Sequence, residues 1–330
     1  MKTRTVDRAR GRPAWAFLVA LLSLALLVLA TTSTPALAAG DSYPLTVTDD
    51  EGTEVTVEAQ PQRIISLSPA NTEIVYALGA GDRLVGRTEW DDYPSEARDL
   101  TPVATFSGVN MEQAVALEPD LVLAAGNFFT PPDDIATMRE LGIPVVVVYA
   151  PDVPTVLADI ELIGEVVGAR DEAAALVADM NDQFDAIAAA VAEVESSPRV
   201  FYEVGAEPEI YAPAPDSFLA DLVIMAGGEP ITTGDAAAWA IPLEELLVAD
   251  PEVIVLGDAN YGVCPANVAA RPGWEDMTAV VDGAVVPVDD VPVTRPGPRL
   301  AQGLASLARA IHPELELAGF PADPPMCEAG

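Results

Sequence analysis

Apolar residues recur every three or four positions between Asp171 and Pro198, the longest regular stretch of the chain. Acidic residues fill the positions between them, and the apolar set is Ala173, Val177, Met180, Phe184, Ile187, Val191 and Val194. This spacing places one apolar stripe on a single helix, which no glycine or proline interrupts. We predict a helix that Asp171 caps and that runs from Glu172 to Glu195, about 36 Å at ~1.5 Å per residue.

Similar sequence patterns lie on both sides of this helix. Glu112 stands seven residues before Pro119, and Glu244 stands seven residues before Pro251. In each copy a short helical stretch fills the gap and a strand rich in β-branched residues follows. A repeat on both sides of one long helix predicts two similar lobes that the helix joins.

Short apolar runs bounded by turn residues predict the remaining elements. A hairpin is expected from 45–49 and 54–58, because two alternating runs flank a turn that contains Gly52. The buried strands are expected at 63–67, 84–87, 121–124, 145–148, 199–203, 253–256 and 284–288. The intervening helices include one that ends at Gly79 and others at 112–117, 133–141 and 300–311.

Continuous apolar strands that alternate with helices are typical of parallel sheets covered on both faces. We therefore predict an α/β fold: two Rossmann-like lobes joined by one long, rigid helix, with the ligand cleft between the lobes. The predicted division is a signal peptide at 1–38, an N-terminal lobe at 39–168, the linking helix at 169–197 and a C-terminal lobe at 198–330. The long helix should limit closure to a small hinge motion.

The first forty residues read as an export signal. Basic residues precede an apolar run at 15–30, and Ala36-Leu-Ala38 fits a small-x-small cleavage site. We expect a periplasmic or extracellular protein. An uncleaved membrane anchor is the alternative, because the apolar run is only slightly short of a span.

Charge and cysteine content narrow the partners. The formal charge is −36, and no lysine follows Lys2. This argues against nucleic acid, because phosphate binding needs basic patches. The two cysteines, Cys264 and Cys327, are expected to form one disulfide in an oxidising compartment. A metal site from two thiols and the single histidine is disfavoured, and we expect a monomer without a cofactor.

Aromatic residues gather where the predicted strands end. Trp90 and Tyr93 follow the strand at 84–87, Phe128 follows 121–124, Tyr211 follows 199–203, and Trp239 precedes the second Glu–Pro unit. Ligands of open parallel sheets bind at the carboxyl ends of strands, so these are candidate ligand contacts. The alternative is that the rings pack the loops onto the core.

Several motifs together resemble one known family. They are Arg63-Ile-Ile-Ser-Leu-Ser-Pro-Ala-Asn-Thr-Glu73, Asp92-Tyr-Pro94, Gly108-Val-Asn-Met-Glu112, Ala116-Leu-Glu-Pro-Asp-Leu-Val122 and Arg295-Pro-Gly-Pro-Arg299. The chain looks like the helical-backbone periplasmic binding proteins, substrate-binding components of ABC importers for cobalamin, iron siderophores and haem. The resemblance covers essentially Val55 to His312 and is strongest to cobalamin-binding members.

The resemblance implies how the protein would meet its transporter. In the family one surface glutamate per lobe docks into basic pockets of the two membrane subunits, and Glu112 and Glu244 match those positions. Two carboxylates on two lobes present one acidic point to each half of a two-fold permease. The alternative is a glutamate that each helix dipole favours by itself.

The resemblance also implies a ligand and its contacts. Trp90 matches an aromatic of the cobalamin cleft, Phe106 stands where those members have a tryptophan, and Trp239 lies within one residue of a second. Arg295 matches a basic residue of the C-terminal lobe, with capping of loop carbonyls as the alternative. Flat aromatic walls suit a corrin or porphyrin plane, and the expected ligand is cobalamin.

Other readings stay open at this point. A ferric siderophore would need several cationic side chains, which this chain has in small number. Haem would need an axial ligand such as Tyr211 or Tyr93, and direct Zn²⁺ or Mn²⁺ capture would need a histidine cluster. A secreted enzyme or a sensor domain is the alternative from another class. No nucleophile elbow or phosphate loop is found, so we expect no catalysis.

Overall fold

The computed structural model describes residues 42–105, 107–127 and 129–327. The predicted signal peptide and the candidate ligand contacts Phe106 and Phe128 lie outside the described residues. Among the helices that are described, none combines the length and the apolar character needed to cross a bilayer.

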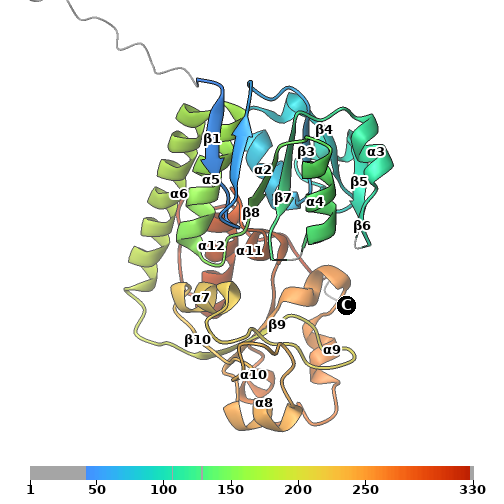
Figure 1. Ribbon diagram of the computed structural model, residues 1–330. Coiled ribbons are helices and arrows are strands. Elements are labelled where there is room, and N and C mark those ends of the chain that lie inside the picture. The colour runs from blue at the N-terminus through green and yellow to red at the C-terminus, as the bar shows by residue number, and fades with distance from the viewer. Residues whose placement is uncertain (1–41, 106, 128, 328–330) are drawn as a thin grey trace, which may run out of the picture. The chain divides into compact units, whose positions relative to one another are not determined.

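A hairpin and a six-stranded sheet, the first sheet, form the N-terminal half (Figure 1). The predicted hairpin is confirmed: β1 (Leu45–Thr48) pairs antiparallel with β2 (Glu54–Val57). The sheet order is β6-β5-β4-β3-β7-β8, and only the β5–β6 pair is antiparallel. Its strands are β3 (Ile64–Ser66), β4 (Leu84–Thr88), β5 (Thr101–Thr105), β6 (Gly108–Val109), β7 (Leu121–Ala125) and β8 (Val145–Val148).

Strands β3, β7 and β8 of this sheet are buried on both faces, as continuous apolar runs require. Every residue of β3 and of β8 is buried. The helices between the strands are α2 (Pro69–Ala77), α3 (Met111–Ala116), α4 (Pro132–Glu140) and α5 (Val153–Val167), with short 3₁₀ turns η1 (Gly81–Arg83) and η2 (Ser95–Asp99).

The long helix is α6 (Arg170–Val191), and its predicted limits were wrong at both ends. Ala169 is the N-cap, so Asp171 lies in the first turn, where a carboxylate also favours the positive end of the helix dipole. Beyond Val191 the chain tightens, because Val194 donates its backbone N–H to the carbonyl of Val191 at 3.1 Å. The apolar stripe itself is confirmed: Ala173, Met180, Phe184 and Ile187 are buried.

Helix α5 was not predicted and packs along α6 (Figure 1). It begins at Asp152, whose carboxylate accepts from the backbone N–H of Thr155 at 2.8 Å, and it ends at Gly168 in the left-handed conformation. Gly164 permits the close approach to α6, because a Cβ there would lie 2.4 Å from the Ala173 side chain.

The C-terminal half contains a four-stranded, wholly parallel sheet, the second sheet, in the order β10-β9-β11-β12. Its strands are β9 (Arg199–Glu203), β10 (Glu229–Pro230), β11 (Val253–Leu256) and β12 (Val285–Pro287). Its helices are α7 (Phe218–Met225), α8 (Leu243–Ala249), α9 (Pro265–Ala269), α10 (Thr278–Val281), α11 (Val291–Thr294) and α12 (Leu300–Ile311), with the 3₁₀ turn η3 (Gly257–Tyr261). Helix α12 has the predicted limits and packs against α6, α7 and β11.

The predicted repeat is a real structural unit. In the first copy Arg63 donates to the carbonyls of Leu117 and Glu118 at the end of α3, at 2.6–3.2 Å. In the second copy Arg199 donates to the carbonyls of Ala249 and Asp250 at the end of α8, at 2.7–3.0 Å. Arg63 stands directly before β3, and Arg199 begins β9. These two strands pair with β7 and β11, the strands that follow α3 and α8.

The residues before the two prolines also match. Glu118 and Asp250 have left-handed φ values of 47° and 46°. After the prolines, Asp120 accepts from the backbone N–H of Arg63 at 2.9 Å, and Glu252 accepts from that of Arg199 at 3.0 Å. The two halves therefore share one local design down to single hydrogen bonds.

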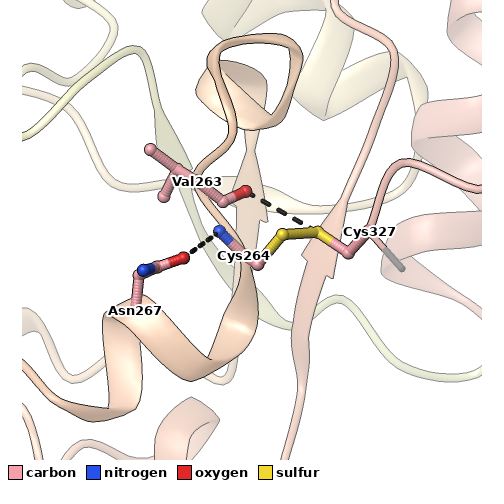
Figure 2. Close-up of a disulfide and its surroundings, with 4 residues drawn as sticks. All are labelled: Val263, Cys264, Asn267 and Cys327. Atoms are coloured by element: carbon pink, nitrogen blue, oxygen red, sulfur yellow. Dashed lines mark hydrogen bonds between the residues drawn. A yellow bond between two sulfur atoms is a disulfide. The ribbon is translucent and has the colours of Figure 1, made fainter. Parts of the chain in front are cut away.

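The disulfide between Cys264 and Cys327 is confirmed (Figure 2). It joins the residue before α9 to a position 63 residues further along the chain. The backbone N–H of Cys264 donates to the side-chain oxygen of Asn267 at 2.8 Å, which fixes the start of α9 (Figure 2). The C-terminal segment is thereby tied to the second sheet.

Candidate functional site

Exposed aromatic side chains lie after the strands of the first sheet. Tyr93 follows β4, Phe129 follows β7 and Tyr149 follows β8, and all three are exposed, Tyr93 and Tyr149 by less than half of their surface. Phe129 is the most open, at 77% exposure. Sequence reasoning had missed Tyr149, whose hydroxyl accepts from the side-chain amide of Asn127 at 3.1 Å.

Trp90 lies in a loop that a buried carboxylate organises. Asp91 is buried and accepts from the hydroxyls of Thr72 on α2 and Thr88 on β4. Burial raises the pKa of Asp91, while the hydrogen bonds from the two threonines act in the opposite direction. The backbone N–H of Trp90 in turn lies 3.3 Å from the Thr88 hydroxyl oxygen. The half-buried Trp90 is therefore held beside α2 at the end of β4.

The second sheet presents a matching set. Tyr261, at the end of η3 after β11, is 85% exposed, and it was also missed from sequence. Tyr211 and Trp239, both predicted, are brought together: Ala212, next to Tyr211, donates its backbone N–H to the Trp239 carbonyl at 2.8 Å. Tyr211 also bridges to Gly205 just after β9. Trp239 is exposed and Tyr211 is half-buried.

Arg295 forms ion pairs that neither expectation included, and it also reaches one loop carbonyl, as the alternative expected. Its guanidinium pairs with the buried Glu73 of α2 at 3.0 Å and with Asp92 at 2.8 Å, and it lies 3.4 Å from the carbonyl of Trp90. Burial lowers the pKa of Arg295, but the hydrogen bonds and charges of Asp92 and Glu73 outweigh it, so the net pKa is raised. Arg295 is therefore positively charged, and the carboxylates of Glu73 and Asp92 balance its charge.

Arg299 completes this ion-pair cluster. It binds both oxygens of Glu73, with Nε–Oε2 at 2.8 Å and Nη2–Oε1 at 2.6 Å, which is the strong two-point geometry. The same guanidinium lies over the Tyr93 ring, 4.0 Å from its centroid. Two arginines of the C-terminal half thus hold the α2 end of the first sheet, including the Trp90–Tyr93 loop.

Buried and half-buried carboxylates gather at the ends of β9, β11 and β12. Glu203 is fully buried and forms a two-point pair with Arg271 at 2.5 and 2.7 Å. Asp258 lies beside it: burial and, next to it, Glu203 raise the pKa of Asp258 to about 7 against the opposing effect of Arg271. Arg271 also stacks on Trp274, 4.6 Å from the ring centroid. Sequence reasoning named none of these residues.

Asp290 lies just after β12 and belongs to the same group of carboxylates. Burial raises the pKa of Asp290 to about 6, with Asp289 adding to the rise and Arg295 opposing it. Tyr202, the residue before Glu203, is 1% exposed, and burial raises its pKa well above the usual value, with Asp290, Asp258 and Asp289 adding to the effect. In a chain this acidic, no pattern singled these carboxylates out beforehand.

Glu112 and Glu244 take equivalent places in the repeated unit. Each is the second residue of its helix, and each side chain is exposed. An exposed apolar residue follows one turn later: Val115 on α3 and Leu247 on α8, with Val248 beside it. Each helix therefore shows a carboxylate next to an apolar patch.

Two surface pockets among the described residues contain none of the predicted ligand contacts. The larger, about 340 Å³, lies between α6, α12 and residues 318–321, and the other lies on α5 and α6. Within the part of the chain that is described, no three His, Cys, Asp or Glu side chains come close enough to hold a metal ion.

The aromatic strand ends and the paired lobes agree with a family match over residues 64–292, described as periplasmic binding protein. The chain belongs to the periplasmic binding protein family. A substrate-binding lipoprotein of an ABC transporter from Bacillus subtilis, itself uncharacterized, is 36% identical over 277 residues, which cover 82% of this chain and 87% of that protein. A cobalamin-binding protein of Halobacterium salinarum is 32% identical, over 82% of this chain and 75% of its own length.

Solved structures of the periplasmic binding protein family have the same fold. The periplasmic vitamin B12-binding protein BtuF of Vibrio cholerae matches with a TM-score of 0.68 and 26% identity, over 76% of this chain and 97% of its own. Haem-binding and iron-binding periplasmic proteins are also among the structural relatives. The chain is thus the substrate-binding protein of an ABC transporter, a class of binding proteins that work with a membrane permease.

Proposed function

We propose that this protein captures cobalamin, or a chelate of similar build, outside the cytoplasm and delivers it to an ABC permease without catalysing a reaction. The cobalamin-binding relatives support the ligand, and the exposed aromatic rings at the strand ends suit a broad apolar ring face. The exported location rests on the predicted signal peptide and on the lipoprotein relative.

Charge is the observation that carries the choice of ligand. The arginines that reach the strand ends, Arg271, Arg295 and Arg299, are each paired with a carboxylate of the chain. An anionic chelate such as haem or a ferric siderophore would have to compete with Glu73 or Glu203 for them. Cobalamin carries uncharged carboxamides around its ring and makes no such demand.

Calorimetric titration of the purified protein with cyanocobalamin tests this function. We expect sub-micromolar binding that Trp90→Ala weakens at least tenfold, because the ring contact is lost. Phe320→Ala is the matched control, an aromatic truncation at the pocket between α6 and α12, and should leave the affinity within twofold. No binding heat with cyanocobalamin would refute the proposed ligand.

Haem is the second candidate, because exposed phenols lie at the strand ends. Tyr93, Tyr149 and Tyr261 could each offer an axial oxygen to iron. Haemin added in the same experiment, followed by its Soret absorbance, separates the two ligands. Tight haemin binding with a phenolate-type spectrum, lost in one tyrosine-to-phenylalanine variant, would favour haem over cobalamin.

Docking is proposed to use Glu112 and Glu244, one from each copy of the repeat. Their exposed place in the first turn leaves both carboxylates free to reach a partner. Two equivalent acidic points fit a permease built from two equivalent membrane subunits.

A further inference from the structure

Three strands of the second sheet end in a group of polar side chains that the proposed docking and aromatic contacts do not use. Tyr202 is the next-to-last residue of β9, Asp258 follows β11, and Asp289 with Asp290 follows β12. We call these four residues the polar cluster. The Tyr202 ring packs over Gly257, since a Cβ there would lie 2.4 Å from the ring and 2.7 Å from its hydroxyl oxygen. The phenol therefore lies directly beside the chain segment that carries Asp258.

Two buried oxygens of the polar cluster have no hydrogen-bond partner among the described residues: Tyr202 Oη and Asp258 Oδ1. Both side chains are more than nine-tenths buried, with Tyr202 1% and Asp258 7% exposed. Buried polar atoms in folded proteins nearly always have a partner, so each one without a partner calls for an explanation. Here one atom is a donor, the phenol, and the other is a carboxylate acceptor.

The charge of the surroundings limits what the missing partner can be. Asp258 lies near the buried Glu203, whose carboxylate already binds Arg271, and the charges of Asp258, Asp289 and Asp290 all act on Tyr202. A carboxylate or phosphate placed there would meet this excess of negative charge. A multivalent metal ion is not favoured, since no three ligating side chains converge in the described part of the chain.

The chain itself places one carboxamide against this cluster. The side-chain nitrogen of Asn260 donates to Asp289 Oδ1 at 2.9 Å, and its oxygen accepts from the backbone N–H of Asp290 at 3.2 Å. These two contacts hold η3 to the segment after β12. A carboxamide both donates and accepts hydrogen bonds. Tyr202 Oη lacks an acceptor and Asp258 Oδ1 lacks a donor, so one carboxamide would supply both partners.

We propose that the polar cluster of Tyr202, Asp258, Asp289 and Asp290 binds a primary carboxamide of the ligand and rejects a carboxylate at the same place. The amide N–H would donate to Asp258 Oδ1, and the amide oxygen would accept from the Tyr202 hydroxyl. Both atoms lie below the surface, so η3 must move away for the ligand to reach them, and the Asn260 contacts are the ones that would open. The inference rests on the proposed function and adds to it the chemistry of one subsite.

The test compares cyanocobalamin with its derivatives in which one ring carboxamide has been hydrolysed to a carboxylic acid. We expect the wild-type protein to bind at least one derivative tenfold or more weakly than the parent. Asp258→Asn and Asp290→Asn should each narrow that ratio to below threefold, because they remove the repelling charge. Tyr202→Phe should weaken binding of cyanocobalamin about three- to tenfold.

Asp282→Asn is the matched control. It removes one carboxylate from the same half of the chain, but after α10, before β12 begins, and its side chain is exposed. The amide-to-acid ratio should stay as in the wild type. Equal affinity of the wild type for cyanocobalamin and for every acid derivative would overturn the proposal, as would an unchanged ratio in both asparagine variants.

A second measurement needs no variant and guards against variants that fail to fold. An N–H donor favours the ionised form of Asp258, so binding near pH 6.5 should release protons, measured as a dependence of the calorimetric heat on the buffer's ionisation enthalpy. Asp258 faces Glu203 and Arg271, and Asp290 faces Asp289 and Arg295. Proton uptake on binding would contradict the proposal, because it would mean that the ligand brings negative charge to the cluster.

Failure of the ligand and failure of the subsite can be told apart. If cyanocobalamin produces no heat, the proposed ligand is wrong, and the same comparison is made between haemin and its diamide. Tighter binding of the diamide would still support a carboxamide subsite. Equal or tighter binding of haemin, or no binding of either compound, would overturn it.

Discussion

Arg63 and Arg199 hold equivalent positions in the two halves of the chain, and each closes a short helix that begins beside an exposed glutamate. At the strand ends the equivalence stops. The first sheet ends in aromatic loops that Arg295 and Arg299 clamp through Glu73. The second sheet ends in buried carboxylates around Tyr202, and it is joined by a disulfide to the C-terminal segment.

We interpret this difference as a division between two proposed tasks, docking to the permease and binding of the ligand. A permease with two equivalent subunits presents the same surface twice, so the parts that meet it should be alike in both halves. A chelate ligand has chemically different sides, so the parts that contact it need not match. The structure fits this division: the repeated unit carries Glu112 and Glu244, and the unlike strand ends carry the candidate ligand contacts.

The largest expected effect comes from breaking the part that is alike. Glu112→Ala combined with Glu244→Ala should reduce ligand uptake by the reconstituted transporter at least tenfold, while ligand affinity stays within twofold of the wild type. Each single variant should lose part of the rate, because one acidic point still docks. Uptake is measured with labelled ligand in proteoliposomes.

Glu245→Ala provides the control for that experiment. Glu245 is exposed in the same helical turn as Glu244, but it has no counterpart at the matching place in α3, which holds Gln113. Its loss should leave uptake unchanged. If it lowers uptake as much as Glu244→Ala does, docking depends on general negative charge and not on the repeated position.

A second effect concerns the clamp on the first sheet. Glu73→Gln keeps the size of the side chain but leaves two buried arginine contacts without their carboxylate, so we expect a loss of about 3 kcal/mol in the free energy of unfolding. Urea unfolding followed by tryptophan fluorescence measures it. A loss of this size would show that Arg295 and Arg299, from the C-terminal half, stabilise the α2 end of the first sheet through Glu73.

Comparison with Asp92→Asn separates the contribution of the buried pair, Glu73–Arg295, from that of the more exposed pair, Asp92–Arg295. Asp92 also pairs with Arg295, but its side chain is about half exposed, and exposed pairs contribute about 1 kcal/mol or less. A Glu73→Gln variant no less stable than Asp92→Asn would show that water already solvates the clamp.

The repeated unit could be predicted from sequence because its cause is local. A glutamate, a short helix and a proline at fixed spacing define both copies, and the structure adds the matching left-handed residues Glu118 and Asp250. Helix α12 was predicted with the correct limits for the same reason: its apolar period is uninterrupted. The end of α6 was placed too late, because only backbone hydrogen bonds of the last turn, and no sequence signal, mark Val191.

The strand-end chemistry could not be predicted, because its partners are far apart in the chain. Arg295 was considered as a ligand contact or as a cap for loop carbonyls, while its partner Glu73 lies 222 positions away. Asp258 and Asp290 follow different strands, and in a chain with 52 acidic residues neither stood out. Only the parallel pairing of β9 with β11 and of β11 with β12 brings them to one edge.

The smallest expected effect concerns carboxyl groups with raised pKa values, one in each half of the chain. On the first sheet, burial raises the pKa of Asp159 in α5 to about 8, and the nearby Asp50 and Asp152 add to the rise. Asp50 also accepts from the backbone N–H of Tyr149 at 2.6 Å, so the pair lies next to an exposed aromatic strand end. On the second sheet, Asp258 has a pKa of about 7.

Because each folded pKa lies above the unfolded value near 3.9, the contribution to stability is fully present below that value and is lost as the pH rises through the folded pKa. Each of the two carboxyls lowers the free energy of unfolding by up to about 1.4 kcal/mol per pH unit while it stays protonated, so together they should lower it by about 2 kcal/mol per unit between pH 6 and 8. Asp159→Asn should remove its share of the slope up to about pH 8, and Asp258→Asn only the share below about pH 7. Asp152→Asn removes one of the charges that raise the pKa of Asp159, so it should reduce this slope by less than Asp159→Asn does. Urea unfolding at each pH gives the slopes. Identical slopes in the wild type and in Asp159→Asn would mean that Asp159 does not hold a proton in this pH range. The two halves would then differ in protonation as well as in charge, because only the second sheet would carry a protonated carboxyl group.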